Sequence, residues 1–542
     1  MRVLTANEVR EAERQALTQP EISTLVLMQR AGHAVAQFCL AHFKFSSVCV
    51  VCGKGNNGGD GFVAAEALRE IAGNVSVIVL AEDAGELSAD AAAMCSRMTV
   101  QPIWVASQTE FQDEKLRKAL GGADLIIDAI VGTGFKPPLR GLAHKAVEAI
   151  NEAVGTVVAV DLPSGVDADR KTPLHTTDDE VVFAHGIVTF IAPKPAHVLG
   201  ELTAGPIAVS ELGIQPVPIP NQSELKVTTG QEVGITFPPR LQDANKGQFG
   251  HVLVIAGSVG KSGAAVLSGL AALRTGAGLV TVACPKSIQP TVAGFAAELM
   301  TEPLPETDEG TISPAAAKKV DALLSGKDVI VLGPGLSRNE ETARFVRQLV
   351  VRSQLPLVLD ADGLNAFAGH YQELKASGNG FLALTPHPGE AARLIGVSTK
   401  EIQAERLETA RRISRETGAC VVLKGSRTIV AGASGESWVN MTGNPALAKG
   451  GSGDVLSGIV GAALGRKGGH VPVQSGNEEK AKLFLKDARV AAAVYLHGLA
   501  GDVARDMLHE NTVLATDLLD SLSESFRDSE LQMDRGLFYL QK

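Results

Sequence analysis

Short apolar runs alternate with longer segments in which apolar residues recur at helical spacing. The run at 46–52 is followed by a glycine-rich stretch at 53–61 and then by a helical pattern, and this order recurs along most of the chain. Apolar runs of this length that end in glycine indicate buried strands. The alternation of strand and helix predicts parallel sheets with helices on both faces, and therefore an α/β protein.

The first part of the chain supplies one set of such elements. Its pattern predicts helices at 6–18, 22–42, 62–71, 88–98 and 141–153, and strands at 46–52, 75–80, 124–131 and 156–160. Polar clusters follow three of these strands. Ligands of parallel sheets bind at the carboxyl ends of the strands, so these clusters mark the expected site.

A second set begins after a proline-containing linker at 214–228. Its pattern predicts strands at 251–256, 279–283, 328–332, 356–359, 381–384 and 420–423, and helices up to residue 275, at 455–464 and at 486–507. We expect a polar loop at 465–479 and a loose extension at 523–542. A chain of 542 residues exceeds one ordinary core, which predicts two domains, at 1–220 and 228–542.

Composition narrows the classes of partner. The net charge is −10 and aromatic residues make up 4%, which argues against a nucleic-acid partner. We find no apolar run of membrane-spanning length and no signal peptide, and therefore expect no membrane partner. Of the six cysteines, four lie in or beside apolar runs, which is typical of reduced thiols and predicts a cytoplasmic protein. Cys49 and Cys52 should point to opposite faces of one strand, which favours core packing over a redox or metal role.

The loop after the first strand carries Gly53, Gly55 and Gly58 in G-x-G-x-x-G spacing. Together with Glu82 or Asp83 after the next strand, this matches the fingerprint of dinucleotide-binding dehydrogenases. The match is weak when it stands alone, and the loop is more polar than a pyrophosphate turn requires. A dehydrogenase is therefore one alternative.

Three oxygen-bearing side chains, those of Asn57, Asp128 and Ser164, lie at strand ends of the same predicted sheet. An amide, a carboxylate and a hydroxyl suit a hard or monovalent cation. The alternative is the ordinary role of such residues in turns.

In the second domain, Gly450, Gly451, Gly453 and Asp454 precede an apolar helix. Glycine N–H groups at a helix N-terminus favour an anion such as a phosphate. A carboxylate beside that phosphate suggests a general base that acts on a hydroxyl. The alternative is that Asp454 is only the N-cap of the helix.

Other motifs are less specific. The turn at 257–262 resembles a P-loop, but Ile255 stands where its first glycine is required, so a tight strand-to-helix turn is equally compatible. His387, between two prolines, is either a site residue or part of a rigid loop. We find neither a Cys/His zinc cluster nor a Ser–His nucleophile elbow, so hydrolase chemistry is not supported.

Taken in order, the motifs resemble known families. Gly55-Asn-Asn-Gly-Gly-Asp-Gly61, Asp128-Ala-Ile-Val-Gly-Thr-Gly134 and Asp161-Leu-Pro-Ser-Gly165 are similar to the YjeF-type epimerase domain. Gly333-Pro-Gly335, Thr385-Pro-His-Pro-Gly-Glu390, Lys424-Gly-Ser426 and the stretch 444–458 are similar to the carbohydrate-kinase-like NAD(P)H-hydrate dehydratase. The chain therefore resembles the bifunctional NAD(P)H-hydrate repair enzymes.

This resemblance implies a Rossmann-like three-layer first domain, a ribokinase-like second domain and metabolite repair. The first domain would interconvert the R and S epimers of hydrated NADH and NADPH. The second would dehydrate the S form to NAD(P)H, with ADP as phosphoryl donor and AMP and phosphate as products. It also implies K⁺ in the first domain and Mg²⁺ in the second. We further expect a homo-oligomer.

The resemblance also assigns residues. The potassium ligands would be Asn57, Asp128 and Ser164. The epimerase would hold its substrate with Asn56, Asn57, Gly58, Gly59, Asp60, Gly132, Thr133, Gly134, Phe135, Lys136, Pro137, Pro138 and Asp161. The dehydratase would contact the hydrate with Ala264, Gly335, His387 and the base Asp454, and the nucleotide with Lys424, Gly425, Ser426, Arg427, Thr428 and Gly453.

Some alternatives stay open at this point. Asp161 and Asp60 are both candidates for moving protons in the epimerase. A ribokinase-like kinase with an N-terminal regulatory module, and a non-enzymatic nucleotide-binding protein, are compatible with the fold alone. The sequence does not distinguish NADH from NADPH or ADP from ATP.

Overall fold

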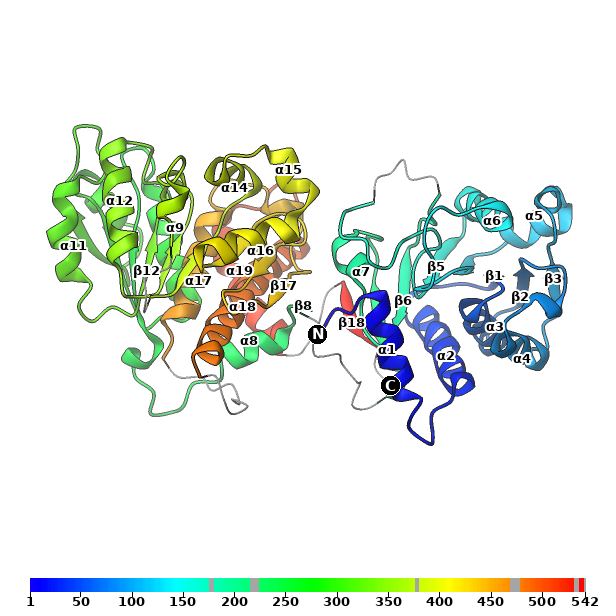
Figure 1. Ribbon diagram of the computed structural model, residues 1–542. Helices are drawn as coiled ribbons and strands as arrows, with labels where there is room; N and C mark the ends of the chain where they lie inside the picture. The colour runs from blue at the N-terminus through cyan, green and yellow to red at the C-terminus, as the bar shows by residue number, and fades with distance from the viewer. Residues whose placement is uncertain (175–179, 215–223, 376–379, 468–477, 531–535, 541–542) are drawn as a thin grey trace. The chain divides into compact units, whose positions relative to one another are not determined.

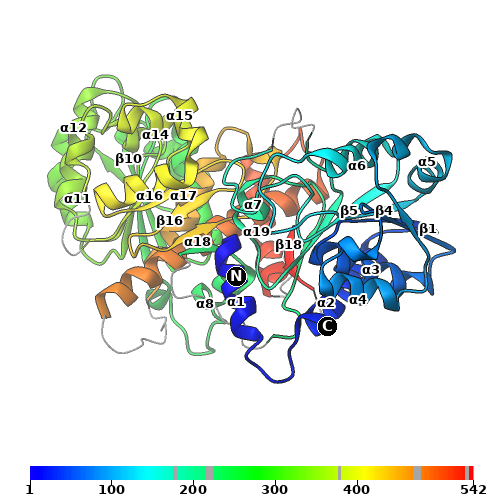
Figure 2. The same ribbon diagram turned by 45° about the vertical axis from the view of Figure 1, so that its right-hand side comes forward.

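The computed structural model describes residues 1–174, 180–214, 224–375, 380–467, 478–530 and 536–540. The chain divides into two compact units, Met1–Ser223 with Arg535–Lys542, and Glu224–Asp534. In each unit, helices cover a central sheet (Figures 1 and 2). The α/β class with two domains is confirmed. The units differ from the expected bounds of 1–220 and 228–542 at the start of the second unit and at the C-terminus.

The first unit is built from seven α-helices and eight strands within the described residues. Its strands are β1 (Ser47–Cys52), β2 (Asn74–Val79), β3 (Pro102–Trp104), β4 (Leu125–Ala129), β5 (Thr156–Val160), β6 (Gly186–Phe190), β7 (Ile207–Ser210) and β18 (Leu537–Tyr539). Its helices are α1 (Ala6–Ala16), α2 (Thr24–His42), α3 (Asn56–Arg69), α4 (Ala89–Arg97), α5 (Glu114–Gly121), α6 (Gly141–Glu152) and α7 (Pro195–Leu199), with 3-10 turns η1 (Ala84–Glu86) and η2 (Gln108–Gln112).

The sheet of the first unit has the order β18-β7-β6-β5-β4-β1-β2-β3, and its paired strands are parallel. Cys52 packs into the apolar cluster on one face and Cys49 into the cluster on the other. Both thiols are free and buried, as expected for core residues. The order reverses between β1 and β4, which is the arrangement of a dinucleotide-binding three-layer fold.

Helix α3 begins at Asn56, six residues earlier than predicted, so most of the glycine-rich stretch is helical. A Cβ on Gly58 would collide with the carbonyl oxygen of Gly53, and one on Gly61 would collide with Ala129 and Cys52. These glycines therefore allow the first turns of the helix to lie directly on the sheet. The prediction of a loop was wrong because glycine was taken as a turn signal and not as a sign of close packing.

The second unit contains a larger sheet. Its strands are β8 (Leu225–Val227), β9 (His251–Ile255), β10 (Leu279–Pro285), β11 (Met300–Leu304), β12 (Val329–Leu332), β13 (Leu357–Leu359), β14 (Leu382–Leu384), β15 (Cys420–Leu423), β16 (Ile429–Ala431) and β17 (Ser437–Val439). Its helices are α8 (Gly230–Thr236), α9 (Ser262–Arg274), α10 (Gln289–Ala293), α11 (Ala317–Leu323), α12 (Glu340–Arg352), α13 (Asp362–Asn365), α14 (Pro388–Ile395), α15 (Thr399–Ala404), α16 (Arg406–Thr417), α17 (Ser452–Gly465), α18 (Glu478–Met507) and α19 (Ala515–Glu530). Its 3-10 turns are η3 (Lys246–Phe249), η4 (Lys286–Ile288), η5 (Pro314–Ala316), η6 (Tyr371–Glu373) and η7 (Pro445–Leu447).

The strands of the second unit follow the order β11-β10-β9-β12-β13-β14-β15-β16-β17-β8. The pairing is parallel from β11 to β15, and β16 is antiparallel to both of its neighbours. Strand β8 pairs with β17 although it was expected to belong to the linker. Residues 215–223 of that linker lie outside the described residues.

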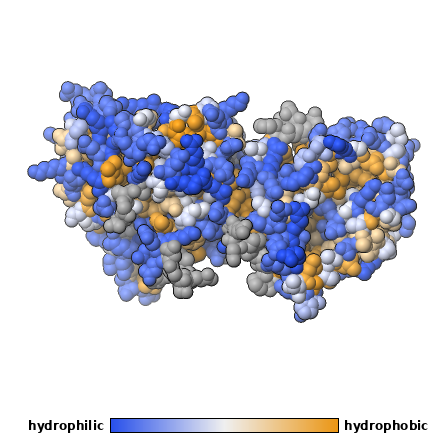
Figure 3. Space-filling model, in the orientation of Figure 1, coloured by the Kyte–Doolittle hydropathy of each residue, from blue (hydrophilic) through white to orange (hydrophobic). Residues whose placement is uncertain are grey.

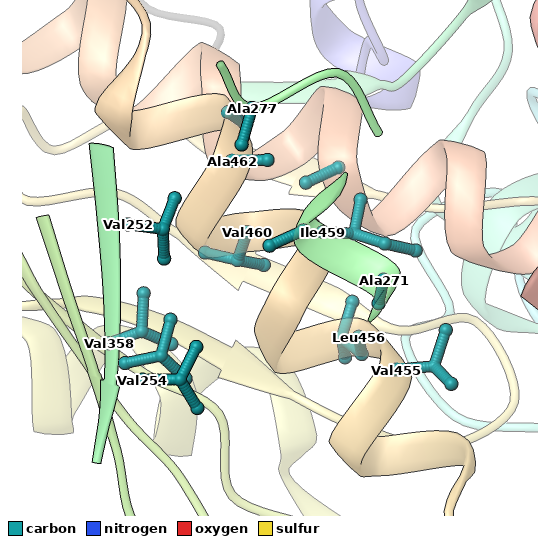
Figure 4. Close-up of a cluster of buried hydrophobic side chains, with 14 of the residues drawn as sticks. Val252, Val254, Ala271, Ala277, Val358, Val455, Leu456, Ile459, Val460 and Ala462 are labelled. Carbon is teal, nitrogen blue, oxygen red and sulfur yellow. The ribbon is translucent and has the colours of Figure 1, made fainter. Parts of the chain in front are cut away.

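Helix α17 forms the centre of the second core. Its side chains Val455, Leu456, Ile459 and Val460 are buried, and Figure 4 shows Val460 on the side toward Val252 and Ile459 on the side of Ala271. Gly461 lies against Val331 on β12, where a larger side chain would not fit. This packing holds the N-terminus of α17 in a fixed position over the carboxyl edge of the sheet.

Two segments that were predicted as irregular contain some helix or strand. Helix α18 begins at Glu478, so the loop expected at 465–479 ends earlier, and its residues 468–477 lie outside the described part. The expected loose extension at 523–542 includes the end of α19 and strand β18, which pairs with β7. Short edge strands of this kind carry little periodic signal.

One face of the molecule is largely polar. On the face drawn in Figure 3, hydrophilic residues predominate in both units, with small apolar patches between them. Among the described residues, none of the helices combines the length and the apolar character needed to cross a bilayer.

Replacement of Gly58 by alanine tests the helix–sheet contact. The added methyl group has to displace the backbone at Gly53, so we expect destabilisation of about 1–3 kcal/mol in chemical unfolding. The matched control is Gly121→Ala at the end of α5, where nothing lies within 4 Å of the added Cβ. It should be neutral or stabilising by less than about 1 kcal/mol. Equal effects of the two substitutions on the free energy of unfolding would contradict the close contact between Gly58 and the backbone at Gly53.

Candidate active sites

A cleft of about 840 Å³ opens in the first unit at the carboxyl ends of β1 and β4. The strand order reverses at this point, where parallel sheets bind ligands. The predicted residues that line it are Asn56, Asn57, Asp60, Gly132, Thr133, Gly134, Phe135 and Asp161. The convergence of three separate sequence motifs on one cleft is therefore observed.

Five predicted contact residues do not line this cleft. Gly58 and Gly59 are buried inside α3. Lys136 forms ion pairs with Asp167 at 2.7 Å and Asp169 at 3.4 Å. The remaining two are Pro137 and Pro138, beside Lys136 in the same loop.

Asp161 and Lys194 form a buried ion pair beside the cleft. Their oxygen and nitrogen are 2.7 Å apart, and the side chains are 10% and 1% exposed. The other carboxylate oxygen accepts a hydrogen bond from the backbone N–H of Thr133 at 2.7 Å. Burial alone raises the pKa of the Asp161 carboxyl, but Lys194 and the hydrogen bonds outweigh it and hold that pKa well below its usual range. Asp161 is therefore a fixed anion.

His197 holds this pair in place. Its Nδ1 accepts the backbone N–H of Lys194 at 2.9 Å, and its Nε2 lies 2.8 Å from the carbonyl oxygen of Asp161. Burial lowers the pKa of His197 to about 4, so the ring is neutral and Nε2 is the donor. Asp161 has φ of +66°, a strained conformation for a non-glycine residue.

Lys194 and His197 were not identified from the sequence. The signal that could have found Lys194 is its position between Pro193 and Pro195, just after the apolar run of β6. His387, which the sequence does mark as a candidate, has the same setting between two prolines after a strand.

Two further carboxyl groups line the same cleft, those of Asp60 on α3 and Glu13 on α1. Burial raises the pKa of Asp60 well above its ordinary value, and the negative charges of Asp161 and Glu13 add to this. Burial also raises the pKa of Glu13, with Lys194 opposing the shift. Neither carboxyl has a hydrogen-bond partner among the described residues.

Of the three predicted cation ligands, Asn57 lines the cleft, and Asp128 and Ser164 are bonded to each other. Asp128 is fully buried and accepts hydrogen bonds from the hydroxyl of Ser164 at 2.6 Å and its backbone N–H at 2.7 Å. Burial raises the pKa of Asp128 to about 6, since no cationic side chain pairs with it in the described part of the chain. The buried amide nitrogen of Asn57 has no partner there either.

The second site lies at the carboxyl ends of β12 to β15. Lys424, after β15, is 2.9 Å from an oxygen of Asp360 and 3.7 Å from an oxygen of Glu390. Burial lowers the pKa of Lys424, but these carboxylates outweigh it and the net shift is upward. Lys424 is therefore a permanently charged group at the centre of the site.

Asp454 is the third residue of α17, and the N-cap is Gly451. The alternative that Asp454 is only a cap is therefore wrong. Burial raises the pKa of Asp454 to about 7, and Asp360 adds to this while Lys424 opposes it. The N–H groups of Gly453 and Asp454 lie in the first turn of the helix, where they have no helical partner. A titratable carboxyl thus stands beside an anion-binding turn.

Ala264 and Gly335, predicted to contact the hydrate, lie against each other. A Cβ on Gly335 would be 2.9 Å from that of Ala264, and the φ of Gly335 is +64°. Lys261 beside them pairs with Asp362 at 3.3 Å. The turn at 257–262 thus places Lys261 beside Asp362, and Ala264 follows in the first turn of α9.

The predicted nucleotide loop after β15 is held by a residue that was missed. Arg406 donates hydrogen bonds to the carbonyl oxygens of Leu423 and Lys424 at 3.3 Å and to that of Ser426. Thr428 closes the loop through its hydroxyl, 2.8 Å from the carbonyl of Gly425. The loop is the sequence Lys424, Gly425, Ser426, Arg427 and Thr428.

His387 has an observed structural role at the start of α14, and its role as a site residue stays a prediction. Its Nδ1 accepts the N–H of Gly389 at 3.0 Å and so caps α14, while the side chain is half exposed at the site edge. Burial lowers the pKa of His387, with Glu390 opposing. The other ring nitrogen, Nε2, lies 3.5 Å from an oxygen of Glu390.

Comparison with known proteins follows the same division. Residues 24–196 match the family model of the YjeF-related protein N-terminus, and residues 252–524 match that of the NAD(P)H-hydrate dehydratase. The bifunctional NAD(P)H-hydrate repair enzyme of Moorella thermoacetica is 37% identical over 98% of both chains. The chain belongs to the bifunctional NAD(P)H-hydrate repair enzyme family. The protein of the same name from Escherichia coli K12 is 33% identical over 95% of this chain and 92% of its own.

A solved structure also resembles part of this repair enzyme. The ADP/ATP-dependent NAD(P)H-hydrate dehydratase from Bacillus subtilis, co-crystallised with ATP/Mg²⁺, is 31% identical, covers 56% of this chain and 98% of its own, and has a TM-score of 0.47.

Family membership confirms the predicted enzyme class, with an epimerase and a dehydratase domain, and does not favour the kinase alternative. The dehydrogenase fingerprint is not supported either. Gly55 and Gly58 begin α3, but Asp83 caps the 3-10 turn η1 by accepting the N–H of Gly85 at 2.7 Å.

Replacement of Lys194 by methionine tests the buried pair. Because the folded pKa of Asp161 is depressed, the pair stabilises the repair enzyme above the ordinary carboxyl pKa, and this contribution is lost as pH falls through the folded value. We expect Lys194→Met to lower the free energy of unfolding by about 3–5 kcal/mol at pH 7. The deficit should shrink on acidification, since the isolated carboxyl can then protonate.

The exposed Lys136 offers a matched control, because Lys136→Met removes an ion pair of a side chain that is 57% exposed. Its effect should stay below about 1 kcal/mol. A loss for Lys194→Met that does not depend on pH would show that packing, and not charge, holds Lys194.

Proposed function

We propose that the first unit interconverts the R and S epimers of hydrated NADH and NADPH, and that the second unit dehydrates the S form with ADP as phosphoryl donor, giving AMP and phosphate. The proposal rests on the coexistence of the cleft at β1 and β4 with a titratable carboxyl, Asp454, at an anion-binding helix end. A sugar kinase has no use for the cleft of the first unit. The relatives' name describes them as bifunctional and as repairing NAD(P)H-hydrate, which supports two activities on this substrate.

Dehydration needs a better leaving group than hydroxide. Transfer of a phosphoryl group to the ring hydroxyl converts it into phosphate, which the ring nitrogen then expels with its lone pair. Asp454 takes the hydroxyl proton during transfer, and a pKa of about 7 suits that role because the group is readily both ionised and protonated. The N–H groups at Gly453 and Asp454 would stabilise charge on the group in transfer.

The loop 424–428 would hold the nucleotide, with Lys424 neutralising phosphate charge. Ala264, Gly335 and His387 would contact the hydrate. Among the described residues, no three His, Cys, Asp or Glu side chains form a metal cluster. Mg²⁺ at nucleotide sites takes one or two carboxylates and phosphate oxygens, which Asp360 and Glu390 fit. Bound there, the ion would neutralise the transferring group.

In the first unit, Asn57, Asp128 and Ser164 would hold K⁺. The observation that supports it is the fully buried carboxylate of Asp128, which no described side chain neutralises. An amide, a carboxylate and a hydroxyl supply oxygens of the right kind. The ion would fix the loops at Asn57 and Ser164, and Asn56, Asp60, Thr133 and Phe135 would line the substrate cleft. A cytoplasmic location and a homo-oligomer stay predictions.

The dehydratase is tested by supplying hydrated NADH with ADP or ATP and following the recovery of dihydronicotinamide absorbance. The rate should rise with pH through about 7, because Asp454 has to be ionised to accept the proton. We expect Asp454→Asn to lower the rate by about 10²–10⁴-fold while epimerisation survives. No recovery with either nucleotide would refute the function, and equal loss of both activities would refute the independence of the two sites.

Exchange of K⁺ for tetramethylammonium tests the cation site. We expect slower epimerisation and a lower unfolding temperature of the first unit, because Asp128 loses its counter-charge. Asp128→Asn should lose the response to K⁺ in both measurements. Dehydration of the pure S form is the internal control and should not change. An unfolding temperature that is the same in both cations would contradict the site.

A further inference from the structure

Helix α1 forms one wall of the epimerase cleft. Val9, Arg10 and Glu13 share one helical face and line the cleft together. The helix is fixed at its start, where the N–H of Leu4 donates to the carbonyl of Pro193 at 2.9 Å and the N–H of Ala6 donates to Asp169 at 2.8 Å. It precedes residues 24–196, which match the family model.

Of the three carboxyl groups in the cleft, Asp161 is the least able to exchange a proton. Its oxygens accept hydrogen bonds from Lys194, Thr133 and Thr189, the last at 3.0 Å. Protonation would leave Lys194 buried without a counter-ion, which is strongly unfavourable. Asp161 therefore supplies a fixed negative charge and not a mobile proton.

We propose that Glu13, contributed by helix α1, is the acid–base residue of the epimerase, and that the Asp161–Lys194 pair is its fixed electrostatic partner. The inference rests on the proposed epimerase function. It replaces the earlier choice between Asp161 and Asp60 with a residue that the sequence motifs did not contain.

The charges around Glu13 come from four elements. Arg10 lies on the same helix, Asp60 on α3, Asp161 after β5 and Lys194 after β6. All four side chains line the cleft. Burial and Asp161 raise the pKa of Glu13, while Lys194 and Arg10 oppose the shift. Burial, with the charges of Asp161 and Glu13, raises the pKa of Asp60 well above its ordinary value, so Asp60 releases a proton less readily than an ordinary carboxyl.

The step balances with one shuttling proton. The carboxylate of Glu13 takes the proton of the ring hydroxyl as the bond between the hydroxyl-bearing carbon and the ring nitrogen breaks. The electron pair stays on the nitrogen, the carbon becomes an aldehyde, and Glu13 returns its proton to the nitrogen. After rotation of the aldehyde, the nitrogen attacks the opposite face and the proton travels back through Glu13 to oxygen. No oxidant, reductant or net proton is required.

The test uses the full chain and follows interconversion of the separated epimers by chiral chromatography, with the uncatalysed rate subtracted. We expect Glu13→Gln to lower the epimerisation rate about 100-fold and Glu13→Asp to restore part of it. The wild-type rate should fall on acidification, since Glu13 must be ionised, and Glu13→Gln should lose this dependence. The control is Glu11→Gln on the same helix, where Glu11 bonds to Arg14 and Gln15 outside the cleft.

Dehydration of the pure S form and the unfolding temperature report on folding in every variant, and both should match the wild type in Glu13→Gln. Epimerisation by Glu13→Gln at the wild-type rate would overturn the proposal, as would a pH dependence that survives in Glu13→Gln and disappears in Asp60→Asn. Failure of the wild type itself to interconvert the epimers would instead refute the proposed function of the first unit.

Discussion

Parallel strand pairing is the constraint on which both sites depend, because it brings the carboxyl ends of neighbouring strands to one edge. In the first unit, β4, β5 and β6 are adjacent in the sheet, and the segments that follow β5 and β6 place Asp161 2.7 Å from Lys194. In the second, β13 and β15 flank β14, and the segments after them place Asp360 2.9 Å from Lys424. Residues far apart in the chain therefore meet because the strands that carry them are neighbours in one parallel sheet.

The two sites use the same kinds of charge for opposite purposes. Each contains a lysine that pairs with one carboxylate and lies near others, so the presence of a direct ion pair decides which acid titrates. Asp161 touches Lys194 and is held as an anion. Among the described residues, Asp454 forms no ion pair with Lys424, which pairs with Asp360, and the pKa of Asp454 is raised to about 7. A carboxyl that is paired with a lysine thus stays ionised, whereas a buried carboxyl without such a pair can exchange a proton near neutral pH.

The sequence was sufficient for features that depend on local pattern. The strands that were predicted lie within about three residues of the observed ends, since buried parallel strands read as short apolar runs. Eight strands within the described residues were not predicted: β3, β6, β7, β8, β11, β16, β17 and β18. The start of α3 was missed as well, because glycine packing against a sheet depends on distant residues. Glu13 was missed because nothing in a charged residue of an amphipathic helix shows that it will face a cleft, whereas Lys194 was missed although its position between two prolines at a strand end was a usable signal.

The division into units also constrains how the two reactions cooperate. Every described side chain assigned to the epimerase belongs to Met1–Ser223, and every one assigned to the dehydratase belongs to Glu224–Asp534. Because neither site borrows a side chain from the other, the hydrate can pass between them as a free molecule. Dehydration of one epimer draws the interconversion forward by mass action. A fused chain therefore needs no shared chemistry to repair both epimers, and Asp454 and Glu13 can be varied separately.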